Sequence, residues 1–520
     1  MKRFLIFFMG IIIFSELFAV GNNKNNDKED KTSTFHEVCK KYEIKKLVDD
    51  KRKKNIEKEF KKLDYSFTDP FIVINPYKRA PLSALVKFYT DEKVRLTFQI
   101  IKPDGEKEFI LRSSKYTKNH EYILKFLFAN KENNIIMISE DKSNNKKENI
   151  IKVKTNKLEK AIPIIIEKIS KNENYNYKYL LSFIESSLYP YKSAIIDTKA
   201  NYRWVLYPLK VSHTILKNNE NFFVSHMGTN CFININYLGQ INKVYYMGDY
   251  FFHHDFSYIN NNLAILVTKK NLNSVQDHLI EYDFKNEKII KIWDLRNYFI
   301  IDPSIKRKNV FWEEPVNDWL HANSIYYDKN DNSFIISARY QGIFKINYNG
   351  RFQWHIGKKI KNLKKEYRSK NLQIVRNTKI IYELKDFNHN LKDIQFVWPE
   401  GQHSAMMISR DKLFYFNNNG GNPINLKKVV STGIMYHIDE ENNNVLIVDE
   451  YGREEEIFSY FISSIDYNYL NKNKLLLYGN VESVYKTKIA KLIEYNGNNE
   501  KIMELDLIGD NIFSAKYFIK

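Results

Sequence analysis

The chain has 520 residues, of which 43% are hydrophobic and 15% aromatic, enough to build a large core over two domains. Its 81 Lys and Arg against 62 Asp and Glu give a formal net charge of +19. The lysines are scattered and often interleaved with Asn. This pattern argues against a nucleic-acid partner, which needs concentrated positive charge, and favours attraction of anionic substrates or simply a solvated surface.

The amino terminus is typical of a secretory signal peptide. Two cationic residues, Lys2 and Arg3, precede an apolar run over Phe4–Phe14, and Ala19 offers a cleavage point. The apolar run is well under the ~20 residues that a bilayer requires. We therefore expect a signal peptide over residues 1–19, no membrane span and an exported mature protein, with a retained amphipathic anchor as the alternative.

Residues 20–64 predict a polar linker followed by a charged helix. Gly21–Lys31 has almost no apolar side chains, so it cannot offset the entropy that it would lose on ordering. Phe35–Leu63 is heavily charged but carries enough periodic apolar positions for a thinly packed helix. This helix could dock on the body of the protein or on a second subunit.

The next segment, residues 65–160, predicts a small antiparallel β-sandwich. Short apolar runs alternate there with turn signals such as Pro103-Asp104-Gly105. A helix is expected over Leu158–Ile169, and a connecting segment over 161–191 leads into the second domain. The apolar runs of the sandwich are Phe71–Ile74, Leu82–Tyr89, Val94–Ile101 and Ile135–Ile138.

The stretch from Asp318 to Gly357 predicts a four-stranded meander. Asn- and Asp-rich residues separate the first two strands, and Asn349-Gly350 separates the last two. His321 opens the first strand and Arg339 closes the second, so the hairpin places both at the same end of the sheet. The predicted strands are Ala322–Tyr327, Ser333–Ala338, Gly342–Asn347 and Phe352–Ile356.

The same order of histidine, strand, turn and strand recurs along the chain. His253-His254 precedes a strand pair that ends with Leu263–Thr268, and His403 precedes a pair that ends with Leu413–Phe416. Weaker copies begin near Ser193, Phe223 and Ile462. About six units of four short strands predict an all-β protein with a six-bladed β-propeller over residues 192–520. Three histidines are expected to occupy one structural position, with His254 preferred over His253 because its register matches Leu320-His321 and Gln402-His403.

The motifs around these histidines resemble those of the bacterial periplasmic arylsulfate sulfotransferases. The resemblance covers roughly residues 65–520, and the order and spacing of its motifs carry it. It implies a β-sandwich before the propeller, a periplasmic homodimer, and sulfuryl transfer from an aryl sulfate donor to a phenolic acceptor without a nucleotide cofactor or a metal. The motifs are His253-His254-Asp255, Asp318–Ser324, Ser337–Gln341, Gly401–His403, Tyr436–Glu440 and Glu450–Glu454.

Sulfuryl transfer requires several fixed hydrogen-bond donors and one nucleophile, because charge develops on the sulfuryl oxygens and on the leaving phenolate. Arg339 offers a permanent fork of donors to the sulfuryl oxygens. His254 and His321 can donate to the same oxygens, and one of them can protonate the leaving oxygen. The resemblance assigns the nucleophile to His403, which would form a sulfohistidine in a ping-pong mechanism. Asn323 lies two residues after His321 and so on the same side of the strand, which makes it a second substrate-binding donor.

Three points stay open in the sequence. His253 competes with His254 for the substrate-binding position. Ser404 follows the nucleophile where the family usually has an Asp that could orient the imidazole, so the activation of His403 is unsettled. Cys39 and Cys231 lie far apart in different predicted segments, and we expect two unpaired residues rather than a disulfide. Such residues could not supply the disulfide that lies near the active site of some relatives.

Other classes of protein fit the sequence less well. Three histidines could hold zinc for ester hydrolysis, but Arg339 at the same mouth argues against a metal. The Cys/Ser-x-Pro-x-Arg pattern of type I sulfatases and the Gly-x-x-x-x-Gly-Lys loop of nucleotide-dependent enzymes are both missing from the sequence. The remaining alternative is a non-catalytic propeller that binds a glycan or protein partner, which would have no use for the histidines. His226 and His437 are predicted to be structural, and the loop Lys358–Gln395 is expected to shape the acceptor pocket.

Overall fold

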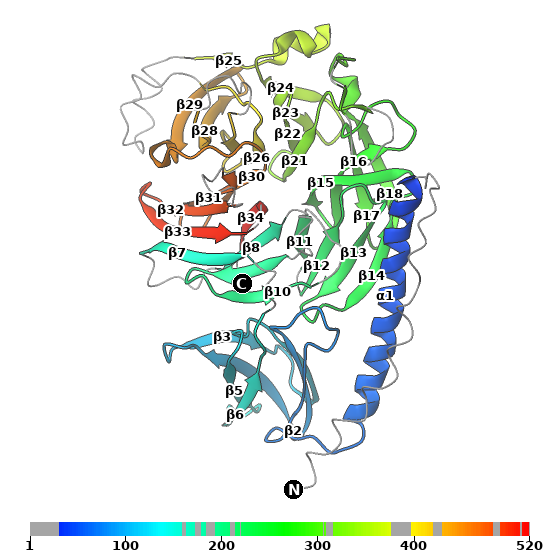
Figure 1. The fold of residues 1–520 in the computed structure, drawn as a ribbon, viewed down its shortest axis with the longest axis vertical. Helices are drawn as coiled ribbons and strands as arrows, with labels where there is room; N and C mark the ends of the chain where they lie inside the picture. Colours follow the sequence, from blue (N-terminus) through cyan, green and yellow to red (C-terminus); the bar gives the residue numbers. More distant parts are fainter. Residues whose placement is uncertain are drawn as a thin grey trace.

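A computed structural model shows a mostly β protein in which a long helix lies along a series of antiparallel sheets (Figure 1). The prediction of an all-β fold is confirmed. No helix among the described residues is both long and apolar enough to cross a membrane. The predicted signal peptide and the first part of the polar linker lie outside the described residues, which are 31–158, 163–171, 178–183, 193–207, 214–218, 220–304, 306–307, 316–375, 397–419, 429–481, 489–509 and 512–518.

The amino-terminal domain is built around one long strand, β2 (Ala84–Ile101). Two separate strands were predicted there, but the pairing continues across the charged Asp91-Glu92, with a register shift between Tyr89 and Val94. The first half of β2 pairs with β1 and β4, and its second half pairs with β3 and β5. The other strands are β1 (Phe71–Ile74), β3 (Lys107–Arg112), β4 (Thr117–Leu124), β5 (Glu132–Glu140) and β6 (Lys146–Lys154).

Six sheets of at least four strands follow in the described part of the chain, and their pairings are antiparallel except for one short parallel pairing in the fifth sheet. The strands of the first three sheets are β8 (Lys178–Phe183), β9 (Ala194–Asp197) and β10 (Tyr202–Val205) with β34 (Ile512–Phe518); β11 (Thr214–Asn218), β12 (Asn221–Ser225), β13 (Cys231–Asn236) and β14 (Ile241–Tyr246); and β15 (Tyr250–Ile259), β16 (Asn262–Lys269), β17 (His278–Asp283) and β18 (Lys288–Asp294).

The other three sheets carry most of the predicted site. Their strands are β21 (Ala322–Asp328), β22 (Ser333–Ala338), β23 (Gly342–Asn347) and β24 (Phe352–Ile356); β26 (His403–Met407), β27 (Lys412–Asn417), β28 (Thr432–Asp439) and β29 (Asn444–Tyr451) with β25 (Gln373–Ile374); and β30 (Ser463–Asn468), β31 (Asn473–Val481), β32 (Ile489–Tyr495) and β33 (Lys501–Ile508) with β7 (Ile164–Ser170). A small pair, β19 (Lys306–Arg307) and β20 (Val316–Asn317), and the short 3-10 turns η1 (Leu295–Asn297), η2 (Ile360–Asn362), η3 (Lys365–Lys370) and η6 (Arg453–Glu455) lie between them.

One edge strand of each of five successive sheets lies against the edge strand of the next, in the order β15, β21, β26, β30 and β34. Side chains of one strand bond the backbone of the next. Asp255 in β15 accepts a hydrogen bond from the Ile325 amide at 3.2 Å, and Asp466 in β30 accepts one from the Tyr517 amide at 2.7 Å. This packing brings together β15, β21 and β26, in or beside which His254, His321 and His403 lie. The closed six-bladed propeller itself stays a prediction.

Both ends of the second domain meet in its sheets, since β33 pairs with β7 and the last strand, β34, pairs with β8 (Figure 1). The predicted helix over Leu158–Ile169 is therefore wrong, because Ile164–Ser170 forms β7. Its run of three isoleucines favours a strand, and an edge of β33 is available to pair with it. The range predicted as a connecting segment, 161–191, thus contributes two strands.

Helix α1 (Lys31–Phe60) runs along one side of the molecule and contacts both domains (Figure 1). Near its carboxyl end, the Phe60 ring stacks on Tyr89 of the amino-terminal domain with 5.1 Å between centroids. Asp49 is fully buried, pairs with Arg79 at 2.7 Å and accepts a hydrogen bond from the Ile241 amide at 2.9 Å. The predicted helix therefore docks on the body of the protein and joins the two domains.

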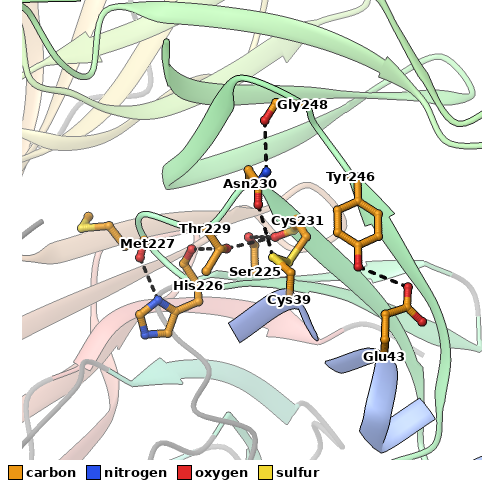
Figure 2. The surroundings of a disulfide bond; sticks show 10 residues. All are labelled: Cys39, Glu43, Ser225, His226, Met227, Thr229, Asn230, Cys231, Tyr246 and Gly248. Carbon is orange, nitrogen blue, oxygen red and sulfur yellow. Dashed lines mark hydrogen bonds between the residues drawn. A yellow bond between two sulfur atoms is a disulfide. The ribbon is translucent and has the colours of Figure 1, made fainter. Parts of the chain in front are cut away.

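A disulfide joins Cys39 of α1 to Cys231 at the start of β13, so the expectation of two unpaired cysteines is wrong (Figure 2). The Cα atoms are 6.1 Å apart although 192 positions separate the residues in the sequence. Both side chains are fully buried. The sequence assigned the cysteines to different segments, but α1 extends beyond the amino-terminal domain and carries Cys39 to the sheet that contains Cys231.

Candidate active site

His254 and His321 place their imidazole rings side by side. His254 lies in β15 and His321 directly precedes β21, and both have left-handed backbone angles, with φ of 54° and 51°. The strand pairing shifts register close to both residues. The ring centroids are 4.8 Å apart. A left-handed backbone is unfavourable for a residue with a side chain, and such strain gathers at functional sites.

The backbone does not place all three histidines in one equivalent position. In β26 the left-handed residue is Ser404, with φ of 49°, so His403 lies one residue ahead of the position that His254 and His321 occupy. The prediction of one shared position is therefore wrong for His403, because each first strand contains its own bulge and sequence alignment alone cannot register them. His403 nevertheless faces the same region, since the charges of Arg339 and His321 both act on it.

His321 is held by a carboxylate that the sequence analysis did not single out. Nδ1 of His321 lies 2.7 Å from Oδ2 of Asp318, and the Asp318 side chain is buried. A carboxylate accepts a hydrogen bond, so Nδ1 of His321 is the protonated nitrogen and Nε2 is left to exchange protons. On its other side, the His321 ring contacts Tyr340 edge to face, with 5.7 Å between centroids. Asp318 belongs to the predicted motif, and its spacing of three residues from His321 was the available signal.

Arg339 lies in the loop between β22 and β23, and the hairpin brings it beside His321 as predicted. Its backbone amide donates to the carbonyl of His321 at 3.0 Å. The guanidinium carbon is 6.0 Å from the centre of the neighbouring Tyr340 ring. This places a permanent cation at the same end of the sheet as the histidines.

His403 is oriented by Asn418, which follows β27 and was also missed. The Asn418 amide nitrogen donates to the Ser459 carbonyl at 2.8 Å and to the Ser463 hydroxyl at 3.2 Å, so its oxygen must face the other way. That oxygen lies 2.7 Å from Nδ1 of His403, which must therefore carry the proton. Nε2 of His403 is left with its lone pair. The Asn418 side chain is fully buried.

His403 is neutral over the ordinary pH range. Burial, and then the nearby charge of Arg339, lowers its pKa from 6.5 to about 3. A neutral imidazole with a fixed Nδ1–H is a nucleophile at Nε2 without any prior loss of a proton. The family usually has an Asp at the position of Ser404, which could orient the imidazole. In this protein the hydrogen bond from His403 to Asn418 orients it instead.

Asn323 and Gln402 tie together the segments that carry the histidines. The Asn323 amide donates to the carbonyl of Gln402 at 2.7 Å, and the Gln402 amide donates to the carbonyls of Ala338 and Gly342 at 2.8 and 2.9 Å. Asn323 is buried. These bonds fix the backbone just before His403 against the hairpin of Arg339. The predicted substrate contact of Asn323 assumed that side chains alternate regularly along the strand after His321. The register shift between Ala322 and Ser324 interrupts that alternation, so the contact stays a prediction.

His253 contacts His254 directly. The two Nδ1 atoms are 3.1 Å apart, so one ring donates and the other accepts. His253 is buried, and burial lowers its pKa to about 3. His253 therefore helps to orient His254, whereas His254 contacts His321. Its binding of substrate stays a prediction.

His226 and His437, which were predicted to be structural, each have a nearby polar partner. Nδ1 of His226 lies 2.7 Å from the carbonyl of Met227, close to the disulfide (Figure 2). Nδ1 of His437 lies 3.0 Å from Asp411. Across the described ranges, no group of three or more His, Cys, Asp or Glu side chains is arranged to hold a metal ion.

Two family models match this chain. The model of arylsulfotransferase (ASST) matches residues 165–517. The chain belongs to the arylsulfotransferase family. The model of the arylsulfotransferase Ig-like domain matches residues 71–156, which are the strands of the amino-terminal β-sandwich. The resemblance seen in the sequence motifs is thereby confirmed.

Two curated relatives carry the name arylsulfate sulfotransferase AssT. The one from Escherichia coli O6:H1 is 26% identical over 286 residues, which cover 47% of each chain. The one from Lelliottia amnigena is 25% identical over 317 residues, which cover 51% of this chain and 52% of that protein. The chain thus spans about half the length of the curated relatives that it matches. Among solved structures, apo AztD from Citrobacter koseri aligns over 82% of this chain and 98% of its own, with 9% identity and a TM-score of 0.30.

Proposed function

We propose that this arylsulfotransferase moves a sulfuryl group from an aryl sulfate donor to a phenolic acceptor, without a nucleotide, through a sulfohistidine at His403. The observation that carries the proposal is the buried, neutral His403, whose Nδ1 proton is held by Asn418. Arg339 and the pair His254–His321 supply cationic and donor groups for the sulfuryl oxygens.

In the first half-reaction, the lone pair of His403 Nε2 attacks the sulfur. A nitrogen–sulfur bond forms, the bond between sulfur and the aryl oxygen breaks, and its electron pair leaves on the phenolate. Protonated His321 gives the Nε2 proton to that oxygen, while Asp318 holds its Nδ1 proton. The Asn418 oxygen accepts a stronger hydrogen bond from the sulfated imidazole, which carries positive charge.

The second half-reaction reverses these steps with a different phenol. The acceptor hydroxyl gives its proton to Nε2 of His321, and its oxygen attacks the sulfur as the nitrogen–sulfur bond breaks. His403 returns to its neutral form and His321 to its protonated form. Because the donor phenol leaves first, both phenols use one pocket in turn, and the kinetics are ping-pong.

The disulfide supports an exported protein, since such bonds persist in oxidising compartments. We therefore retain the predicted periplasmic location as part of the proposal. The predicted homodimer is not needed by this mechanism and stays a prediction.

The proposed activity is tested by incubating the purified protein with a chromogenic aryl sulfate, with and without phenol, in the absence of any nucleotide. Release of the chromogenic phenol should depend on the added phenol, and phenyl sulfate should form in equal amount. If the protein gave no phenol-dependent release, the alternative of a non-catalytic propeller that binds a glycan or protein partner on the same face would take precedence.

Replacing Asn418 by Asp should move the acid limb of the kcat/KM profile to higher pH. In the wild type, the low pKa of His403 means that this residue does not limit activity until the pH falls towards about 3. A carboxylate in the place of the amide favours the imidazolium, so the pKa of His403 should rise by about 1 to 3 pH units. Activity should therefore be lost as the pH falls through the raised pKa.

The measurement is the pH dependence of kcat/KM for Asn418→Asp beside Asn498→Asp, which makes the same charge change in an exposed turn. Asn498→Asp should keep the wild-type profile. Identical profiles for Asn418→Asp and the wild type would show that Asn418 does not control the protonation of His403.

A further inference from the structure

A cavity of about 290 Å³ opens beside Arg339. Its volume is at the lower end for small-molecule sites, which suits a single aromatic ring with its substituents. Tyr340 forms one wall, and the same ring contacts His321 on the active-site side. A molecule in this cavity therefore lies one side chain away from the proposed proton-transfer residue. The other lining residues are Gln341, Gly342, Gly357, Lys358, Lys359, Pro399, Glu400, Gly401 and Tyr460.

Glycines leave part of this cavity without side chains. A Cβ at Gly342, where φ is +95°, would lie 2.2 Å from the Ile356 carbonyl, and a Cβ at Gly357 would lie 2.6 Å from the Gln341 carbonyl. The close approach of the chain segments thus requires glycine at both positions. Both glycines line the cavity, so this part of its wall is backbone without side chains.

The rim of the cavity carries an exposed aromatic side chain. Tyr460 is 45% exposed and belongs to a small cluster with Phe458 and Phe461, whose ring centroids lie 6.1 and 5.9 Å from its own. Aromatic pairs of this kind add to the binding of an aryl ring beyond the apolar area that they bury.

Among the described residues that line the cavity, Arg339, Lys358 and Lys359 are cationic and Glu400 is anionic, so the charge of this lining is positive. Lys358 forms an ion pair with Glu400. Arg339 belongs to the sulfuryl site described above. Lys359 is exposed, and in the described part of the chain no carboxylate lies within ion-pair distance of it. The pKa of Asp302 is lowered mainly by hydrogen bonds from Ser304, and the charge of Lys359 contributes least to this shift.

A second, larger cavity of about 830 Å³ lies at the carboxyl ends of β21 and β28. Its lining is acidic, with Asp328, Asp331, Asp411, Asp439, Glu440 and Glu441 against Arg410 and His437. An aryl sulfate is an anion and would be repelled there. The smaller, cationic cavity is the one that suits the substrates of the proposed reaction.

We infer that the cavity beside Arg339 selects aryl substrates that carry a second anionic group, such as a ring carboxylate. The aryl ring packs between the glycine backbone and Tyr460, and the carboxylate meets Lys359 while the reacting oxygen points past Tyr340 towards His321. This inference rests on the proposed function and names the substrate class of that site. Lys359 is a specificity residue in this arrangement and takes no part in the chemistry.

The test compares three acceptors at a fixed, saturating concentration of a chromogenic aryl sulfate. They are 4-hydroxybenzoate, which is anionic, 4-hydroxybenzamide, its neutral counterpart, and phenol. The wild type should prefer 4-hydroxybenzoate. Lys359→Ala should lower kcat/KM for 4-hydroxybenzoate by about 2- to 5-fold, as expected for an exposed charge pair, and should leave kcat/KM for the neutral acceptors unchanged. Tyr460→Ala should lower kcat/KM for all three.

Lys361→Ala is the matched control, because Lys361 lies in the adjacent turn η2 but does not line the cavity. It should leave the preference unchanged. Equal losses for all acceptors in Lys359→Ala, or a wild-type preference for the neutral phenols, would overturn the inference while leaving the transfer reaction intact. Absence of transfer to any acceptor would overturn the proposed function instead.

Discussion

His403→Ala is expected to lower the rate of sulfuryl transfer by about 10⁴-fold or more, as losses of a covalent nucleophile do in other enzymes. The variant has no group that can take the sulfuryl group from the donor, so release of the first phenol should fail as well as transfer to the second. The fold should persist, because the side chain packs in a site that Asn418 and Gln402 hold through their own bonds.

The rate is measured as phenol-dependent release from a chromogenic aryl sulfate, with thermal unfolding as a check on the fold. His437→Ala is the control, since His437 pairs with Asp411 away from the site. It should retain the wild-type rate. A His403→Ala protein that still transferred at more than about a tenth of that rate would rule out His403 as the nucleophile.

Cys39→Ser should destabilise the protein by about 2 to 5 kcal/mol, because the disulfide restrains the unfolded chain over the 192 positions between its cysteines. The loss should appear as a lower temperature of unfolding. The other contacts of α1, including the buried Asp49–Arg79 pair, remain in the variant and should hold the helix in place at low temperature.

The measurement compares thermal unfolding of the wild type and Cys39→Ser, each with and without a thiol reductant. Reductant should lower the unfolding temperature of the wild type towards that of the variant and should leave the variant unchanged. If the wild type unfolded at the same temperature with and without reductant while its disulfide was shown to be reduced, the bond would have no stabilising role.

Local patterns predicted the strands of the second domain well. Three strands of the Asp318–Gly357 meander form with their predicted bounds, namely Ser333–Ala338, Gly342–Asn347 and Phe352–Ile356. The fourth is one residue longer than predicted. Turn chemistry and alternating burial determine such hairpins over a few residues, so the sequence contains what is needed. For the same reason, the hairpin alone was enough to predict that His321 and Arg339 lie next to each other.

Features that depend on distant contacts could not be predicted. The partners of Cys39 and Ile164–Ser170 are Cys231 and β33, each brought close only by the complete fold. The bulges at the starts of β15, β21 and β26 shift each first strand differently, so the position of His403 could not be aligned with the others. Asn418 lies in an Asn-rich stretch that suggests only a turn, and its role appears when Ser459 fixes its amide.

In the proposed mechanism, His403 carries the sulfuryl group between the two phenols. It is tested most directly by rapid quench of the wild type with an aryl sulfate labelled in its sulfur, without an acceptor, under alkaline conditions that preserve a nitrogen–sulfur bond. Peptide mapping should place the label on His403, and later addition of phenol should remove it. Label on another residue would rule out His403 as the carrier, and no protein-bound label together with intersecting double-reciprocal lines would indicate a single direct displacement.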